Sequence, residues 1–280
     1  MDRQAARRAF ADMVRRRDEE LDLGRAALLL AAHFSPDLDV EPYAARLDAM
    51  AAELGQGLDR RQEPLLVIAD VNRYLFGQQG FRGDHDHYYD PRNSLLNEVL
   101  DRKRGIPITL SVIYLEVTRR LGLPLAGVGF PGHFLVKYLT GEGAIFIDPF
   151  NQGMVLTEED LRDGLARHYG ASERRLDHYL ATVTKRQILT RMLHNLKGVY
   201  LQRRAYDAAL ETINLLLTIS PWNLEEIRDR GMVQVERCAY EDALADLEVY
   251  LEYAPEARDA GRVRRNVDAL RRLIGVDPLV

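Results

Sequence analysis

Hydrophobic residues in the first third of the chain recur mostly at helical spacing, with polar residues between them. This pattern predicts helices within residues 5–32 (interrupted near 22–24), 41–54, 64–76 and 94–103. The stretch from Gly80 to Asn93 is rich in Gly, Asp, His and Tyr and predicts an ordered loop. The first hundred residues are therefore expected to be helical, with one long connection.

The pattern changes after Gly105. Apolar positions between Leu110 and Leu121 lie on one face at helical spacing and predict a helix over 108–121, which ends at Gly122. Three short apolar runs with Gly- and Pro-containing turns between them then predict strands at 126–130, 134–139 and 144–147. Helices followed by an antiparallel meander predict a mostly helical α+β fold with a small antiparallel sheet.

From about residue 156 the pattern is helical to the end, and it contains an internal repeat. The run Tyr206-Asp207-Ala208-Ala209-Leu210 recurs as Tyr240-Glu241-Asp242-Ala243-Leu244, and Pro221 recurs at the same offset as Pro255. This offset, about 34 residues, is the period of tetratricopeptide (TPR) repeats, which are helix–turn–helix units. Two repeats and a capping helix over 260–275 are therefore expected.

The second repeat departs from an apolar interior. Gly231 suits a position where two helices pack closely, but Arg230 and Gln234 stand where apolar residues are expected. Trp222, in the turn between the repeats, is predicted to anchor their stacking.

Composition narrows the class of protein. The chain has 280 residues, 46% of them hydrophobic and 29% charged, with a formal net charge of -5, typical of a globular protein. The negative charge argues against nucleic-acid binding, and no apolar window is long enough for a membrane span. The charged N-terminus favours a cytoplasmic protein. Cys238 is the one cysteine, so an intramolecular disulfide and a multi-cysteine metal site are excluded.

The middle of the chain carries several short motifs in a fixed order. They are Asn93-Ser94-Leu95-Leu96-Asn97-Glu98-Val99-Leu100, Arg104-Gly105-Ile106-Pro107-Ile108-Thr109-Leu110-Ser111, Gly122-Leu123-Pro124, Phe130-Pro131-Gly132-His133-Phe134-Leu135-Val136 and Ile147-Asp148-Pro149-Phe150-Asn151. In this combination the chain resembles the transglutaminase-like (papain-like) core, and especially its bacterial SirB-type branch, in which that core precedes TPR repeats. A related core occurs in a eukaryotic F-box protein. The resemblance implies a core with its N-terminal helices over 1–180 and repeats over 181–280.

The resemblance also implies a catalytic arrangement. A transglutaminase-like enzyme places a Cys at the start of a buried helix, a His on the next strand as the base, and an Asp on the following strand. His133 and Asp148 match the family's His and Asp, with His133 expected to begin a strand. The nucleophile position falls on Pro107, which has no nucleophilic atom. The implied function is a non-catalytic regulatory or adaptor protein, with a protein or peptide partner bound by the repeats and no cofactor.

An enzyme remains the alternative. Ser111 or Thr109, activated by His133 and Asp148, could serve a hydrolase or acyltransferase. Against this, Thr109 could cap the helix, Ser111 could pack in the core or bond back to a carbonyl, and His133 and Asp148 could form a structural or ligand-binding pair. Further candidate binding residues are Asn97, Glu98, Arg104, Pro107 and Asn151, with an ion pair between Arg104 and Glu98 as one possible arrangement.

The loop His85-Asp86-His87, flanked by Asp84 and Asp90, has residue types that bind metals. No further ligand set at a telling spacing follows it, so a hydrogen-bonded loop is favoured and no metal site is predicted. The oligomeric state stays open.

Overall fold

A computed structural model of the chain describes residues 2–141, 143–169 and 176–275. The chain divides into two compact units, residues 1–192 and 193–280, and the division falls inside helix α9 (Lys185–Gln202). Each unit is described by itself.

The predicted N-terminal helices are present in the first unit, and aspartates begin three of them. The side chains of Asp2, Asp22 and Asp39 accept hydrogen bonds from backbone N–H groups in the first turns of α1, α2 and α3. The interruption predicted at 22–24 lies earlier in the structure: α1 ends at Val14, and α2 begins at Leu23 with Asp22 as its N-cap. The helices are α1 (Arg3–Val14), α2 (Leu23–Phe34), α3 (Val40–Gly57), α4 (Pro64–Asn72), which continues as a π-helical turn η1 (Arg73–Gln78), and α5 (Leu96–Arg102).

Helix α6 (Pro107–Arg120) is the central helix of the first unit. Every residue from Pro107 to Thr118 is buried, as expected for a helix enclosed on all sides. Its C-terminal end is followed by Gly122 with φ +69°, a left-handed conformation that suits glycine. The helix even buries Glu116, whose carboxylate pairs with Arg119 (3.1 Å) and Arg120.

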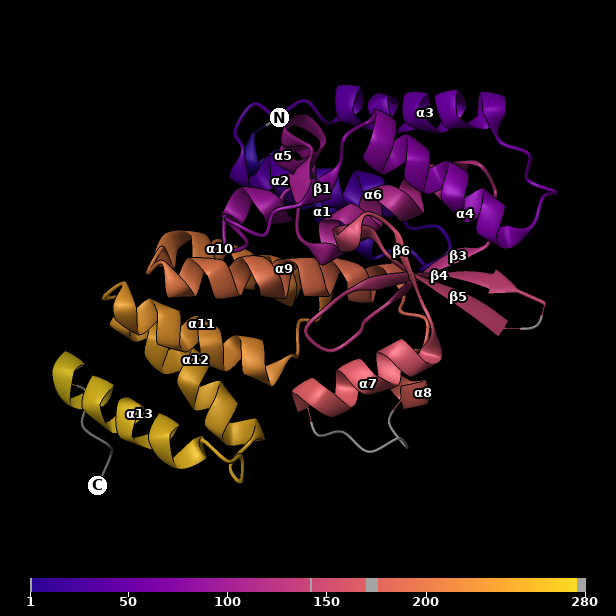
Figure 1. Ribbon diagram of the computed structural model, residues 1–280. Helices are drawn as coiled ribbons and strands as arrows, with labels where there is room; N and C mark the ends of the chain where they lie inside the picture. The colour runs from indigo at the N-terminus through magenta and orange to yellow at the C-terminus, as the bar shows by residue number, and fades with distance from the viewer. Residues whose placement is uncertain (1, 142, 170–175, 276–280) are drawn as a thin grey trace. The chain divides into compact units, whose positions relative to one another are not determined.

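The sheet is an antiparallel meander, as predicted, but with one strand more (Figure 1). Its strands follow in the order β3 (Leu125–Val128), β4 (Leu135–Thr140), β5 (Gly143–Asp148) and β6 (Met154–Leu156). A separate two-residue parallel pair joins β1 (Arg82–Gly83) in the predicted loop to β2 (Arg104–Gly105) just before α6. Two short 3-10 turns, η2 (Pro91–Ser94) and η3 (Pro149–Asn151), complete the connections.

The two faces of the sheet are covered by different helices. Leu135 and Phe146 pack in one apolar cluster with Leu161 and Leu165 of α7 (Glu158–Tyr169). A short helix, α8 (Leu176–Tyr179), follows α7. Because side chains alternate along a strand, the buried residue Val136 faces the opposite side, where β3 and β4 contact α6. The sheet therefore lies between α6 and α7.

The second unit has the predicted repeat geometry. After α9 come α10 (Tyr206–Ile219), α11 (Leu224–Glu236), α12 (Tyr240–Tyr253) and α13 (Ala260–Ile274), which pack in sequence (Figure 1). Helices α10 and α12 are separated by the same offset at their first and at their last residues, and it equals the offset of the sequence repeat. The residues two positions before them, Arg204 and Cys238, both adopt left-handed conformations, with φ of 56° and 59°. The period and the terminal helix are confirmed.

The small residues of the repeats lie where helices pack closely. Ala209 and Ala243 are fully buried, and a Cβ atom on Gly231 would lie 2.8 Å from Leu247 Cγ. The prediction for Trp222 is wrong. It lies in the turn between α10 and α11 and is 77% exposed, so its ring does not hold the repeats together. Among the described residues, no helix is both long and apolar enough to cross a membrane.

Candidate functional site

The start of α6 is where the family's nucleophile is expected, and it is closed by local packing. Pro107 occupies the first helical position, where its missing N–H costs nothing. Thr109 Oγ1 accepts a hydrogen bond from the Ile106 N–H (3.1 Å) and donates to the Asn93 carbonyl oxygen (2.8 Å). Gly105 permits this arrangement, because a Cβ atom there would lie 2.8 Å from Thr109 Oγ1. The Thr109 hydroxyl therefore caps the helix.

Ser111 lies one turn further along α6 and is also fully buried. Its Oγ lies 3.5 Å from the carbonyl oxygen of Phe134, at the limit of a hydrogen bond. Both candidate hydroxyls thus have partners other than His133.

His133 and Asp148 form a pair across the β4–β5 hairpin. His133 Nε2 lies 2.8 Å from Asp148 Oδ2. Asp148 is 2% exposed and ends β5, as expected, whereas the His133 side chain is 24% exposed. His133 does not begin a strand: it lies in the turn before β4, whose first residue is Leu135. Gly132 has φ +66° and turns the chain sharply just before it, which delays strand pairing by two residues.

The Asp148 carboxylate is held by more than the imidazole. Oδ1 accepts hydrogen bonds from the backbone N–H groups of Phe150 (3.0 Å) and Asn151 (3.3 Å), and Oδ2 accepts one from Asn151 Nδ2 (2.7 Å). Burial by itself would raise the pKa of Asp148. The hydrogen bonds and charge of His133, together with Asn151, outweigh burial and lower that pKa below its ordinary value. Asp148 is therefore ionised at neutral pH and fixes the imidazole.

Phe150 joins the predicted loop to this pair. Its ring centroid lies 4.4 Å from that of His85, 6.0 Å from that of Tyr88 and 6.0 Å from that of His133. Gly83 makes room for it, since a Cβ atom there would come within 2.7 Å of the ring. The residues that looked like candidate metal ligands thus contribute an aromatic contact beside His133.

Arg191 on α9 holds the turn that carries His133. Its Nη2 donates to the carbonyl oxygens of Phe130 (2.8 Å) and His133. The guanidinium also lies over the Phe134 ring, with Cζ 5.7 Å from the centroid. This residue was not predicted from the sequence, because a partly buried arginine on a helix 58 residues away gives no local signal.

Asp84 is the centre of a buried polar cluster at the base of the loop. Its carboxylate accepts hydrogen bonds from Asn93 Nδ2 (3.2 Å) and Arg102 Nη2 (3.3 Å) and lies 3.9 Å from Arg104 Nη1. Burial alone would raise the pKa of Asp84, but the hydrogen bonds from Asn93 and from the His87 backbone N–H lower it. Arg104 thus pairs with Asp84, where an ion pair with Glu98 had been considered.

Two further candidate binding residues, Asn97 and Glu98, lie in α5, and Asp90 lies in the loop before it. Asn97 is buried in α5, and among the described residues its Oδ1 has no hydrogen-bond partner. Glu98, next to it, is partly exposed. At the other end of the loop, Asp90 caps η2 and pairs with Arg92 (2.6 Å).

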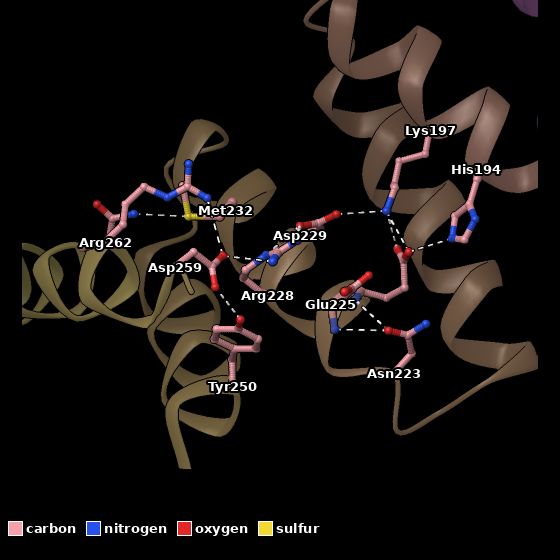
Figure 2. Close-up of polar contacts among 12 residues, drawn as sticks. His194, Lys197, Asn223, Glu225, Arg228, Asp229, Met232, Tyr250, Asp259 and Arg262 are labelled. Atoms are coloured by element: carbon pink, nitrogen blue, oxygen red, sulfur yellow. Dashed lines mark hydrogen bonds and ion pairs between the residues drawn. The ribbon is translucent and has the colours of Figure 1, made fainter. Parts of the chain in front are cut away.

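The repeats contain a polar network of their own (Figure 2). Lys197 Nζ on α9 lies 2.7 Å from Glu226 Oε1 and 2.9 Å from Asp229 Oδ2, both on α11. His194 Nε2 lies 2.9 Å from Glu226 Oε1. Burial alone would raise the pKa of Glu226, but His194 and Lys197 lower it.

The same network continues toward the last helix. Arg228 donates to Asp229 Oδ1 (2.7 Å) and to Asp259 Oδ2 (2.9 Å), and Tyr250 donates to Asp259 Oδ1 (2.6 Å) (Figure 2). Asp259 precedes α13, so ion pairs and the Tyr250 hydrogen bond link α9, α11, α12 and the start of α13 within the second unit.

Comparison with known proteins agrees with this architecture. The family model described as "Transglutaminase-like superfamily" matches residues 41–194, and one described as "Tetratricopeptide repeat" matches residues 196–268. A UPF0162 protein of Xylella fastidiosa (strain Temecula1) is 41% identical over 250 residues, which cover 88% of this chain and 89% of that protein.

More distant relatives match the chain over different lengths. A UPF0162 protein of Vibrio cholerae is 30% identical over 257 residues, 90% of this chain and 95% of that protein. Human F-box only protein 21 is 32% identical over 166 residues, which cover 55% of this chain but only 26% of that protein. This chain therefore belongs to the transglutaminase-like superfamily, and within it to the UPF0162 family, in which the core is followed by TPR repeats.

Proposed function

We propose that this chain is a non-catalytic regulatory or adaptor protein. In this proposal the transglutaminase-like unit has lost its nucleophile, and the repeats bind a protein or peptide partner. The observation that carries it is the closed start of α6: Pro107 stands at the expected nucleophile position, and the Thr109 hydroxyl is used to cap the helix.

Burial of the hydroxyls supports the same conclusion. Thr109 and Ser111 are both 0% exposed, so an acyl substrate could reach either oxygen only after the core had opened. A nucleophile has to lie within hydrogen-bond reach of its base and of its substrate. The contacts of these hydroxyls with Asn93 and Phe134 instead favour structural roles.

In this proposal His133 and Asp148 hold the hairpin together and leave a partly exposed imidazole for a ligand. We expect His133→Ala to lower the free energy of unfolding by about 1–3 kcal/mol, because it removes a hydrogen bond to a buried carboxylate. Urea unfolding measures this, and hydrolysis of activated acyl esters by the same samples measures any turnover. His178→Ala, at an exposed histidine of α8, is the control and should change neither. A His133→Ala variant of unchanged stability that loses a measurable turnover would contradict the proposal.

The pH dependence of stability gives a second test of the His133–Asp148 pair. Because the folded pKa of Asp148 is lowered, its contribution to stability is present above the ordinary carboxyl pKa of about 4. It is lost as the pH falls through the lower folded value. Asp148→Asn should therefore narrow the difference in stability between neutral and acidic pH.

For the repeats, the proposal rests on the family match and on the extended surface that such arrays present to a partner. Full-length protein used as bait should retain its partner when His133 is replaced by Ala. Substitution of exposed repeat residues, such as His194→Ala with Arg262→Ala, should release it. Release by His133→Ala alone would place the partner on the first unit instead.

A hydrolase or acyltransferase is the second candidate. The observation that favours it is the intact pair, in which Asp148 contacts Nε2, so that Nδ1 would be the base in this candidate mechanism. The nucleophile would be Ser111, Thr109 or a bound water. Loss of turnover in Ser111→Ala, with stability unchanged, would support this function over the first.

A further inference from the structure

The chain is unusually poor in lysine. Of its 38 basic residues only four are lysines, namely Lys103, Lys137, Lys185 and Lys197. Arginine stays protonated in proteins, whereas a lysine whose ammonium is destabilised can lose its proton and become a nucleophile. Few amines compete here, so the surroundings of each one decide where an electrophile reacts.

Three of the four amines are firmly held. Lys197 forms ion pairs with the carboxylates of Glu226 (2.7 Å) and Asp229 (2.9 Å). Lys137 and Lys185 each donate to a backbone carbonyl oxygen at 2.8 Å. Burial lowers the pKa of Lys137, but its short bond to a carbonyl favours the ammonium form. These contacts occupy a proton that the amine would have to give up in order to react.

Lys103 has weaker partners. It directly follows α5 in a left-handed conformation, with φ 59°, at a position that usually takes glycine. Its Nζ lies 4.1 Å from the centroid of the Phe81 ring and donates to Gln79 Oε1 at 3.3 Å. None of the ion pairs among the described residues includes Lys103. A ring face and a long bond to a neutral amide compensate an ammonium charge less than a carboxylate does.

The surroundings of Lys103 also lower its pKa. Burial lowers its pKa first, and the neighbouring Arg46 of α3 lowers it further, while Asp101 of α5 offsets part of the change, so that the pKa is about 8. At pH 7 roughly a tenth of the side chain would be the neutral amine, against less than a thousandth for an ordinary lysine. Arg46 also holds the Asp101 carboxylate at 2.9 Å, which weakens the pull of that carboxylate on Lys103.

We propose that Lys103 is an acylation site that reacts with small acyl phosphates without help from another protein. The Nζ lone pair attacks the acyl carbonyl carbon, an N–C bond forms and the C–O bond to phosphate breaks. Inorganic phosphate leaves and the nitrogen loses one proton to water, so that a neutral amide replaces the amine. The product removes the one positive charge over the Phe81 ring, beside the Arg46–Asp101 pair.

The test is to incubate the full chain with acetyl phosphate between pH 6.5 and 9.5 and to follow the acetyl occupancy of all four lysines by peptide mass spectrometry. We expect Lys103 to react about tenfold faster at pH 7 than the lysine of an unstructured reference peptide in the same sample, because its larger amine fraction outweighs its lower intrinsic nucleophilicity. Its rate should level off above about pH 8, while the rate of the reference peptide, whose lysine has the ordinary pKa of about 10.4, continues to rise. Equal rates at the four lysines, or no plateau for Lys103, would overturn the proposal.

A variant without the Arg46 charge tests whether this neighbour contributes to the reactivity of Lys103. Arg46→Gln removes the neighbouring cation and the ion pair of Asp101, which keeps its hydrogen bond from the Tyr43 hydroxyl (2.6 Å). Both changes favour the ammonium form of Lys103 and should slow its acetylation at pH 7 two- to threefold. Arg60→Gln, which removes another exposed cation of this unit, is the matched control and should leave the rate unchanged. If Arg46→Gln reacts as fast as the wild type, the electrostatic basis of the proposal is wrong.

Discussion

The two repeats have the same backbone and different interiors. In the first, Leu196 and Thr212 are fully buried. The equivalent positions of the second repeat hold Arg230 and Asp246, whose side chains form two hydrogen bonds of 2.7 Å. The second repeat thus has an arginine–aspartate ion pair where the first repeat has a leucine and a threonine. Helices α10 and α12 nevertheless have equal lengths.

The difference shows which residues set the period. The features common to both repeats are the left-handed residues before α10 and α12 and the buried alanines Ala209 and Ala243. Turn geometry and close approach of the helices are therefore conserved within the array, whereas the polarity of one interior position is free to change. Each repeat packs only against its neighbours, so a local exchange of this kind need not disturb the rest.

The largest effect is expected from breaking the ion pair. Asp246→Ala leaves the partly buried Arg230 guanidinium without its carboxylate and should lower the free energy of unfolding by about 3 kcal/mol. Thr212→Ala, at the equivalent position of the first repeat, should cost about 1 kcal/mol or less, because it removes only a bond to the Ala208 carbonyl. Urea unfolding followed by circular dichroism compares the two.

Transplanting the first interior into the second sharpens the comparison. The double variant Arg230→Leu with Asp246→Thr removes both charges together and should lie within about 1 kcal/mol of the wild type. If the double variant were as unstable as Asp246→Ala, the ion pair itself would stabilise the second repeat. The loss in Asp246→Ala would then not come simply from leaving Arg230 unpaired.

A smaller effect is expected at the close contact of α11 with α12. Gly231→Ala places a Cβ atom 2.8 Å from Leu247 Cγ and 3.2 Å from the Ala243 carbonyl oxygen, and should cost about 1–2 kcal/mol. Gly198→Ala on α9 meets nothing within 4 Å and should stabilise the helix by about 0.5–1 kcal/mol. Thermal unfolding of both variants gives the signs, and equal signs would contradict the packing described for Gly231.

The smallest effect concerns the shared turns. Arg204→Gly and Cys238→Gly relieve the cost of the left-handed conformation, but glycine also gains freedom in the unfolded chain, so each should stabilise by about 0.5 kcal/mol. Melting temperatures of the two variants should rise by similar amounts. Opposite changes would show that the two turns are not energetically equivalent.

Much of this fold could be predicted because its signals are local. Alternating apolar residues and glycine turns marked β3, β4 and β5, and the constant offset between matching residues marked the repeats. Strand β6 was missed because it has three residues, of which Met154 and Val155 are exposed and give no apolar alternation. The π-helical turn after α4 was missed because its sequence continues the helical pattern.

The candidate site could be predicted only in part. The pairing of His133 with Asp148 followed from the family resemblance, and the two residues flank the strands predicted at 134–139 and 144–147. The contacts that fix the pair come from distant segments: Phe150 meets His85 of the loop, and Arg191 reaches the His133 turn from α9. A single sequence contains no periodic or spacing signal for such long-range contacts, so they required the structure.

Trp222 is the one tryptophan of the chain and has a spectroscopic consequence. Because its indole is 77% exposed, its fluorescence in the folded protein should already resemble that of indole in water. Emission would then change little on unfolding, but a partner that covers the turn between α10 and α11 would exclude water and shift the emission to shorter wavelength. The protein thus contains an intrinsic reporter for binding at a single defined point of the repeats, without any label.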